Sequence, residues 1–202
     1  MNIGVLGGTF DPIHSGHLLI AEEARLRFGL NKVLFVPAGQ PWLKTNREII
    51  PAVHRVEMVK LAIAGNASFE LSTKETDRPG PSYSVDTVAA LQQKLGPGAK
   101  IFFLIGWDSL AELPQWYDPA RLIQLCKLVA VTRLGFNRPD LKSLETAVPG
   151  ITQSVVWLDI PPINISSSDI RDRVVQGLSI HDLVPENVAS YIAENKLYLK
   201  RK

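Results

Sequence analysis

The residues best suited to chemistry lie near the start of the chain, in the stretch IGVLGGTFDPIHSGHL (residues 3–18). Gly7 and Gly8 end an apolar run, and His14 and His17 follow with Gly16 between them. Glycine lets a backbone turn tightly and lets a ligand approach without a Cβ in the way, although a simple turn would explain glycines that stood alone. Exposed N–H groups at the start of the next helix attract phosphate. The pattern therefore predicts a phosphate site in which two imidazoles donate hydrogen bonds to phosphoryl oxygens.

Other kinds of site fit this stretch less well. It contains no GxxxxGKS/T motif and no GxGxxG motif, which argues against a P-loop hydrolase and a dinucleotide oxidoreductase. The HxxH spacing lacks the glutamate of HExxH and has no third ligand cluster nearby, which disfavours a metal site. The single cysteine, Cys126, lies in the apolar segment LIQLCKLVAV, which indicates a small buried thiol rather than a nucleophile.

The elements that must position these residues alternate between strand and helix patterns. Short apolar runs predict buried strands at 3–8, 32–39, 69–73, 100–106, 127–133 and 154–161. Helical periodicity occurs at 17–29, 51–65, 84–96, 118–126 and 138–148, and then at 167–177 and 185–197. This alternation predicts one α/β domain over 1–202, a doubly wound and mostly parallel sheet with 164–202 as its helical C-terminal part. In such sheets the ligand lies beyond the carboxyl ends of the strands, where the unusual residue clusters fall.

The composition limits what the protein binds and where it works. The chain has 202 residues with 22 Lys and Arg against 20 Asp and Glu, so a formal net charge of +2 gives no footprint for nucleic acid or an anionic membrane. No basic leader and no apolar span of membrane length precede the first strand, so we expect neither a signal peptide nor an anchor, and a cytoplasmic location. Monomer and homo-oligomer both remain open.

Two motifs together resemble a known superfamily. GGTFDPIHSGH contains HxGH as residues 14–17, and ISSSDIR (165–171) is similar to the second signature of the HxGH nucleotidyltransferases, ISSTxIR, with Ser168 where threonine is usual. TDRPGPSYSVDT (76–87) and GWDSLAELPQWYDP (106–119) resemble the acceptor-side motifs of the bacterial nicotinate-mononucleotide adenylyltransferase family. The resemblance covers nearly the whole chain and implies a Rossmann-like nucleotidyltransferase fold.

That family joins nicotinate mononucleotide to the AMP part of ATP, giving nicotinate adenine dinucleotide and pyrophosphate in NAD biosynthesis. The resemblance therefore implies ATP and nicotinate mononucleotide as substrates, with Mg²⁺ carried in by ATP. Adenylyl transfer is an in-line displacement at the α-phosphorus, so the protein needs no nucleophile of its own and no covalent intermediate forms.

The resemblance also implies roles for individual residues. His17, His14, Lys44 and Arg171 are the catalytic candidates, with His17 closest to the reacting centre and Arg171 on the β- and γ-phosphates. The implied ATP-binding residues are Gly7, Gly8, Thr9, Phe10, His14, His17, Gly106, Asp108, Ser167, Ser168 and Arg171. The implied mononucleotide-binding residues are Lys44, Thr76, Arg78, Tyr83, Ser84, Val85 and Trp116.

Several of these roles have alternatives. Arg171 could be an ordinary solvated helix residue, and Arg47 competes with Lys44 because QPWLK departs from the family's usual PPHK. Asp108 could bind ribose hydroxyls, cap a helix, or do both. Trp116 could stack on the pyridine ring or belong to the core.

We expect a preference for nicotinate mononucleotide over its amide counterpart. This preference is expected to come from main-chain N–H groups near residues 83–85, with the Arg78 side chain as the competing source. Two competing functions also remain. One is an HxGH transferase with a different acceptor, such as a pantetheine-phosphate adenylyltransferase, and the other is a nucleotide-binding regulator without catalysis.

Overall fold

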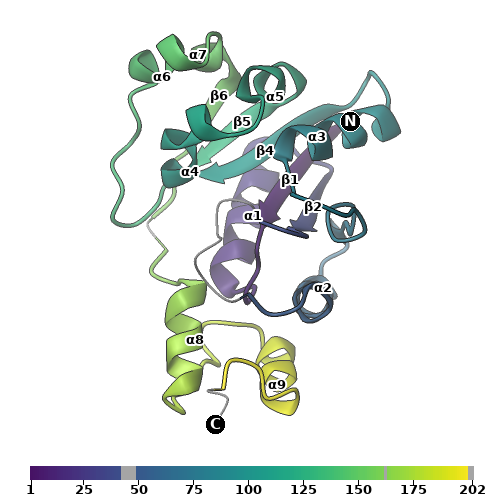
Figure 1. The fold of residues 1–202 in the computed structure, drawn as a ribbon, viewed down its shortest axis with the longest axis vertical. Coiled ribbons are helices and arrows are strands. Elements are labelled where there is room, and N and C mark those ends of the chain that lie inside the picture. The colour runs from purple at the N-terminus through teal and green to yellow at the C-terminus, as the bar shows by residue number, and fades with distance from the viewer. Residues whose placement is uncertain (42–48, 162, 200–202) are drawn as a thin grey trace.

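The computed structural model describes residues 1–41, 49–161 and 163–199 (Figure 1). In these ranges six strands form one sheet in the order β3-β2-β1-β4-β5-β6, and every neighbouring pair is parallel. The strands are β1 (Asn2–Gly8), β2 (Lys32–Pro37), β3 (Phe69–Leu71), β4 (Lys100–Gly106), β5 (Lys127–Val131) and β6 (Val155–Leu158). The predicted α/β class and the parallel sheet are confirmed.

Helices connect the strands and cover both faces of the sheet (Figure 1). They are α1 (Ser15–Arg27), α2 (Ala52–Ile63), α3 (Ser84–Leu95), α4 (Trp107–Ala111), α5 (Pro119–Leu125), α6 (Leu141–Ala147), α7 (Ile151–Ser154), α8 (Ser167–Val175) and α9 (Glu186–Glu194). A 3₁₀ turn at Leu113–Gln115 follows α4. Sequence periodicity did not predict this turn or α7, because elements of about one turn are too short to show a helical repeat.

Two apolar clusters hold the layers together. On one face of the sheet, Phe35 and Leu104 pack with buried residues of α1, α2, α8 and α9, and on the other face Val5 and Phe103 pack with residues of α3 and α5. Successive strand residues point to opposite faces, so strands covered on both sides need apolar residues at nearly every position. This is why the strands appear in the sequence as unbroken apolar runs.

The C-terminal helices belong to the first of these clusters. Ile170 of α8 and Val188 and Ile192 of α9 are buried in the cluster that contains Phe10 and Phe35. In Figure 1, α8 and α9 lie at the opposite end of the molecule from α6 and α7. The helical C-terminal part therefore shares a core with the sheet.

The carboxyl ends of β1, β2, β4 and β5 lie next to one another at one end of the sheet. Gly8 pairs with Pro37 across β1 and β2, and Gly106 pairs with Val131 across β4 and β5, so the loops that follow these strands begin side by side.

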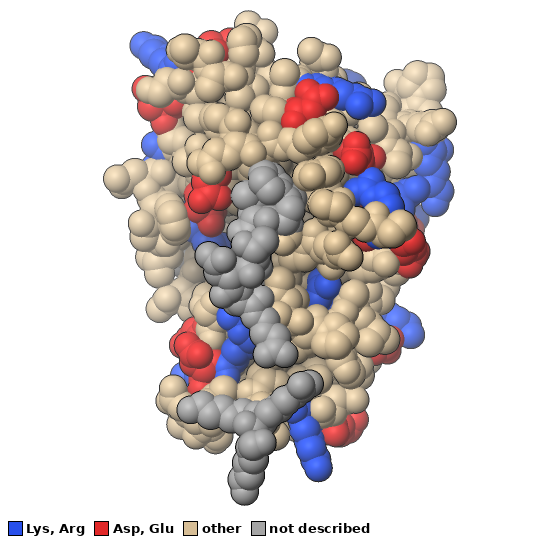
Figure 2. All heavy atoms as spheres, viewed as in Figure 1, with Lys and Arg blue, Asp and Glu red and all other residues tan. Residues whose placement is uncertain are grey.

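Within the described ranges we find no helix that combines the length and the apolar character needed to span a bilayer. The face drawn in Figure 2 mixes Lys and Arg with Asp and Glu, as the small net charge leads one to expect.

Candidate active site

The loop after β1 places both histidines at the start of α1. His14 is the N-cap residue of this helix, and its backbone N–H donates a hydrogen bond to Nδ1 of His17 (3.2 Å). The two imidazoles stack with their centroids 3.7 Å apart, and the Phe10 ring meets the His17 ring edge-on at 5.0 Å. Because Nδ1 of His17 accepts a hydrogen bond, the neutral ring carries its proton on Nε2. The orientation of His17 is therefore fixed by the helix cap itself.

His14 is the more deeply placed of the pair. Its side chain is buried, and burial together with the positive charge of Arg133 lowers its pKa from 6.5 to about 4. At neutral pH this imidazole is therefore uncharged, and it can offer a phosphate an N–H group but no fixed positive charge.

Gly16 is explained by the space around His14. A Cβ at position 16 would lie 2.9 Å from Cγ2 of Ile163 and 3.0 Å from Nδ1 of His14. Contacts of that length are repulsive, so a side chain here would push the imidazole or the 163 segment aside. The glycine between the histidines makes room for the protein's own ring.

A cleft of about 560 Å³ lies above this loop, a volume within the usual range for small-molecule sites. It is bordered by the segments that follow β1, β4 and β5 and by the start of α3 and α8. The structure brings the following predicted site residues together along its wall: Gly7, Gly8, Thr9, Phe10, His14, His17, Tyr83, Ser84, Gly106, Asp108, Trp116, Ser167 and Ser168.

The wall of this cleft carries an unusual number of unpaired polar atoms. Among the described residues, five buried side-chain N or O atoms lack a hydrogen-bond partner, and four of them belong to residues that line the cleft: Asp11, His14, Asp108 and Trp116. Buried polar groups are normally paired, and each unpaired one costs free energy. Their concentration here indicates a surface built to meet a polar ligand.

Of the predicted residues that the structure describes, four do not line the cleft. Thr76 donates its hydroxyl hydrogen to the Thr73 carbonyl (2.9 Å), and the side chain of Val85 is buried in the core. Arg78 pairs with Asp86 (3.5 Å) and donates to the Pro81 carbonyl (3.4 Å). Lys44 and its alternative Arg47 lie outside the described residues.

Arg171 is the fourth, and it is engaged with the loop between β1 and α1 (residues 9–14), the predicted phosphate loop, rather than with solvent. Its Nη1 donates to the carbonyl of Asp11 (2.7 Å) and its Nη2 to Oγ of Ser168 (3.1 Å). The side chain is only 20% exposed, so the interpretation as an ordinary solvated helix arginine is wrong. Both of its partners line the cleft, which leaves this guanidinium directly behind the wall.

Asp108 is not a helix cap. Gly106 is the N-cap residue of α4, and Asp108 is the second residue of the helix, so the cap alternative is wrong. A Cβ at position 106 would lie 2.3 Å from Oδ1 of Asp108, so glycine is needed to let this carboxylate fold back over the strand end. Its Oδ2 lies 3.7 Å from Nε of Arg133.

Arg133 is a charged residue of the cleft that the sequence analysis missed. It lies just beyond β5, lines the cleft, and has a side chain that is 53% exposed. Its guanidinium group can therefore contact a ligand in the cleft. The rule that ligands meet the carboxyl ends of parallel strands could have identified it, since it is the last residue of the predicted strand 127–133.

The side of the cleft that is predicted to hold the acceptor is aromatic, with a buried carboxyl beside it. Trp116 lines the cleft and also packs edge-on against Phe103 (6.3 Å), so it borders the ligand space and the core at once. Tyr83 and Tyr117 stack at 4.5 Å. Burial raises the pKa of the Glu75 carboxyl, which also lines the cleft and accepts a hydrogen bond from Oγ1 of Thr87 (2.7 Å).

Cys126 is buried as predicted, and it plays no part in the cleft. Its thiol donates to the Leu122 carbonyl (3.4 Å), and burial raises its pKa to about 12. A thiol with that pKa is almost entirely protonated at neutral pH and is a poor nucleophile.

Comparison with known proteins identifies the class. The model of the cytidylyltransferase-like family matches residues 5–173, so the chain is a member of this class of nucleotidyltransferases. A protein of Dehalococcoides mccartyi named "Probable nicotinate-nucleotide adenylyltransferase" is 45% identical over 98% of this chain and 97% of the relative. One of Thermomicrobium roseum with the same name is 43% identical over 97% of this chain and 91% of the relative. The chain belongs to the nicotinate-nucleotide adenylyltransferase family.

Solved structures share the fold at lower sequence identity. The nicotinic acid mononucleotide adenylyltransferase of Plasmodium falciparum complexed with NaAD superposes with a TM-score of 0.79 at 20% identity, covering 98% of this chain and 97% of that one. A structure described as a putative nicotinate-nucleotide adenylyltransferase of Vibrio parahaemolyticus gives a TM-score of 0.68 at 19% identity, covering 99% of this chain and 96% of that one. The resemblance stated from the motifs is confirmed.

The burial of His14 makes stability depend on pH. An imidazole that stays neutral when folded but takes up a proton when unfolded stabilises the folded state fully above pH 6.5, and this contribution is lost as the pH falls toward 4. From these pKa values we expect His14 to account for a loss of about 2 kcal/mol in the free energy of unfolding between ~pH 7.5 and ~pH 5. Urea unfolding of the wild type and His14→Gln at both pH values measures it. Equal pH dependence in the two proteins would contradict the assignment.

Crowding around the glycine between the histidines gives a second test. Gly16→Ala should lower kcat/KM by one to two orders of magnitude, since a displacement of about 1 Å in a catalytic group costs up to ~100-fold. Gly65→Ala is the matched control, because no atom lies within 4 Å of the Cβ it would add. Steady-state kinetics of both variants decide the matter, and an unimpaired Gly16→Ala protein would show that the His14 ring tolerates displacement.

Proposed function

We propose that this protein transfers the adenylyl group of ATP to nicotinate mononucleotide, giving nicotinate adenine dinucleotide and pyrophosphate. The observation that carries the proposal is one cleft in which a histidine pair at a helix start faces an aromatic acceptor wall. Family membership supports it, as does the NaAD complex of the Plasmodium falciparum neighbour. Incubating the purified protein with ATP and nicotinate mononucleotide, and separating the products by chromatography, tests it directly.

In this proposal the triphosphate lies over the phosphate loop. Gly7 and Gly8 leave room at the strand end, while His14 and His17 donate N–H groups to phosphoryl oxygens. An oxygen of the mononucleotide phosphate attacks the α-phosphorus, and the bond from that phosphorus to the bridging oxygen of pyrophosphate breaks with its electrons on the leaving group. Donors already aimed at the leaving oxygens stabilise the growing charge without reorganising.

Cations complete the phosphate side. Arg133 reaches the cleft, and Arg171 lies behind Ser168, from where a small movement of its fork would bring it to the β- and γ-phosphates. Ser167 and Ser168 begin α8, so their backbone N–H groups add to the anion site. Lys44 or Arg47 supplies a further positive charge in this proposal.

Mg²⁺ belongs to the proposal as part of the substrate. Among the described residues there is no group of three or more His, Cys, Asp or Glu side chains placed to hold a metal ion, so ATP oxygens and water are assigned as its ligands. The ion would neutralise part of the charge on the phosphates. The residues of the cleft then have the task of orienting a triphosphate that already carries its cation.

The acceptor side recognises the pyridine ring and its carboxylate. Tyr83 is the N-cap residue of α3, so the backbone N–H groups of Ser84 and Val85 lie in its first turn, where anions are favoured. Trp116 offers a face on which the ring can stack. Thr76 remains a supporting residue of the loop through its bond to Thr73.

The two competing functions are less well supported. A different acceptor is disfavoured by relatives named for nicotinate-nucleotide transfer over nearly the full chain. A regulator without catalysis would be marked by loss of a phosphate-contacting histidine or of Arg171, and the chain keeps His14, His17 and Arg171. The cytoplasmic location stays part of the proposal.

Loss of His17 should affect catalysis more than binding. His17→Ala is expected to lower kcat by two to four orders of magnitude, the usual cost of removing one preorganised donor or proton-transfer group, with a much smaller change in ATP affinity. His181→Ala, at an exposed position outside the cleft, is the control. A kcat for His17→Ala within a few-fold of wild type would leave His17 with only a structural role.

One substitution distinguishes the two possible sources of the preference for nicotinate mononucleotide over its amide. Arg78 is held by Asp86 and by the Pro81 carbonyl, so Arg78→Ala should keep the preference for the acid, which we expect to be about 100-fold from one charge-assisted bond gained and one mismatch avoided. Measuring kcat/KM for nicotinate mononucleotide and its amide on both proteins gives the answer. If the preference disappears with Arg78, the backbone explanation is wrong.

A further inference from the structure

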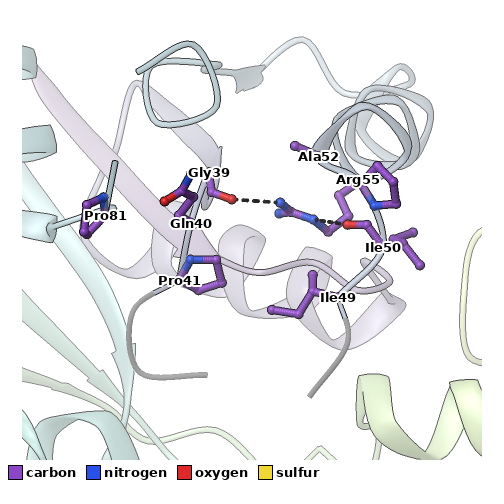
Figure 3. A pocket seen from close by; sticks show the side chains of 9 residues that line it. Gly39, Gln40, Pro41, Ile49, Ile50, Ala52, Arg55 and Pro81 are labelled. Carbon is purple, nitrogen blue, oxygen red and sulfur yellow. Dashed lines mark hydrogen bonds between the residues drawn. The ribbon is translucent and has the colours of Figure 1, made fainter. Parts of the chain in front are cut away.

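Arg55 is a buried cation outside the cleft whose hydrogen-bond acceptors among the described residues are main-chain carbonyls. It lies in the first turn of α2 and is 2% exposed. Its Nη1 donates to the Thr9 carbonyl (2.8 Å), its Nη2 to the Gly39 carbonyl (3.3 Å) and its Nε to the Ile50 carbonyl (3.2 Å). Figure 3 shows the guanidinium between Gly39 and Ile50, at the wall of a second cavity of about 530 Å³.

The three carbonyls belong to separate parts of the site. Thr9 lies in the phosphate loop and lines the cleft, and Gly39 follows β2. Ile50 directly precedes Pro51, the N-cap residue of α2. One planar group with five N–H donors therefore ties both ends of the 39–50 loop to the phosphate loop. Lysine cannot reproduce this, because its ammonium is a single point with no fork.

A second set of bonds continues from Gly39 to the acceptor side. The backbone N–H groups of Gly39 and Gln40 both donate to Oγ of Ser82 (3.0 and 3.3 Å), and the N–H of Ser82 donates to the Gln40 carbonyl (3.0 Å). Ser82 lines the cleft next to Tyr83, at the start of α3. A continuous path of hydrogen bonds thus runs from Thr9 in the phosphate loop through Arg55 and Gly39 to Ser82, just before α3.

The buried charge has a nearby counter-charge. Burial lowers the pKa of Arg55, while the carboxylate of Asp11 acts in the opposite direction and favours its charged form. Asp11 is 1% exposed, lines the cleft, and accepts a hydrogen bond from the Tyr198 hydroxyl (3.0 Å). A buried cation is strongly destabilising unless it is paired and hydrogen-bonded, and here three carbonyls and the Asp11 carboxylate meet that need while holding the guanidinium in one orientation.

We propose that Arg55 is a positioning residue that sets the distance between the ATP and mononucleotide halves of the cleft through Thr9, Gly39 and Ser82. The inference rests on the proposed function, since it concerns the alignment of two bound substrates. In-line transfer needs the attacking oxygen close to the α-phosphorus and opposite the leaving group. A link that fixes one loop relative to the other acts on this alignment and much less on the binding of either substrate alone.

The test separates alignment from binding and from stability. In Arg55→Lys, measured well below its melting temperature, kcat should fall at least ~10-fold while the calorimetric Kd for ATP and for nicotinate mononucleotide each change less than about threefold. Met58→Ala is the control, because Met58 is a fully buried residue of the same helix that packs in the core and borders neither cavity. It should lose stability but keep kcat per folded molecule.

Ser82→Ala provides a variant at a partly exposed position that can be studied even if Arg55→Lys does not fold. It removes the hydroxyl that holds Gly39 and Gln40, and should lower kcat about three- to tenfold with both Kd values kept. If both single variants fold, their effects on kcat should be less than additive in the double variant, because both interrupt one path.

Each outcome has one meaning. A kcat of Arg55→Lys within about threefold of wild type, or no change in Ser82→Ala, overturns the positioning role while active wild-type protein upholds the proposed function. A rise in the Kd for either substrate as large as the fall in kcat also overturns the positioning role, because Arg55 would then support binding. A wild-type protein that forms no dinucleotide overturns both proposals together.

Discussion

The parallel pairing of β1 with β2 on one side and β4 on the other is the constraint on which the site depends. The strand order runs outward in both directions from β1, so the connections after β1 and after β4 leave on opposite faces of the sheet. A crevice opens at such a switch point because no helix crosses directly above it. The two glycines at the end of β1, the start of α1 and the carboxylate of Asp108 all meet in this one crevice.

In the proposed function, local geometry rather than overall charge provides the affinity of this crevice for anions. The net charge of the chain is only +2, and the imidazole of His14 is neutral at physiological pH. What remains is a set of oriented N–H groups at the start of α1, α3 and α8, with Arg133 as an exposed cation. Such groups hold charge without a change in their own protonation. The site is therefore preorganised for charge that moves from one phosphate group to another.

The fold was largely predictable because its signals are local. Each predicted run from residue 3 to residue 161 became a strand, since a strand buried on both faces must be apolar throughout. The loop of the two histidines was predictable because its glycines and histidines follow the first run directly, at the strand end where ligands bind in such sheets. Asp108 shows the limit, because the cap position lay two residues earlier than cap preferences placed it.

Contacts made by the backbone and by distant segments left no signal in the sequence. Arg55 lies in a regular helical pattern, and its three partners are carbonyls, which every residue possesses. The bond between Tyr198 and Asp11 joins positions 187 residues apart, so neither residue type marks the other. The same holds for Arg171, whose motif indicated a phosphate ligand but gave no sign of its bond to the carbonyl of Asp11.

The glycines of the site show how a correct signal can have a different cause. Room for a ligand was predicted at Gly7 and Gly8, whereas at Gly16 and Gly106 the atoms that a Cβ would strike belong to the protein: Ile163 and His14 in one case, and the Asp108 carboxylate in the other. Neither glycine has a positive φ, so conformational freedom does not explain them. Both leave space in which a polar side chain can fold back toward the cleft. At these two positions glycine therefore makes room for side chains that line the cleft, and the space left for the ligand depends on where those side chains lie.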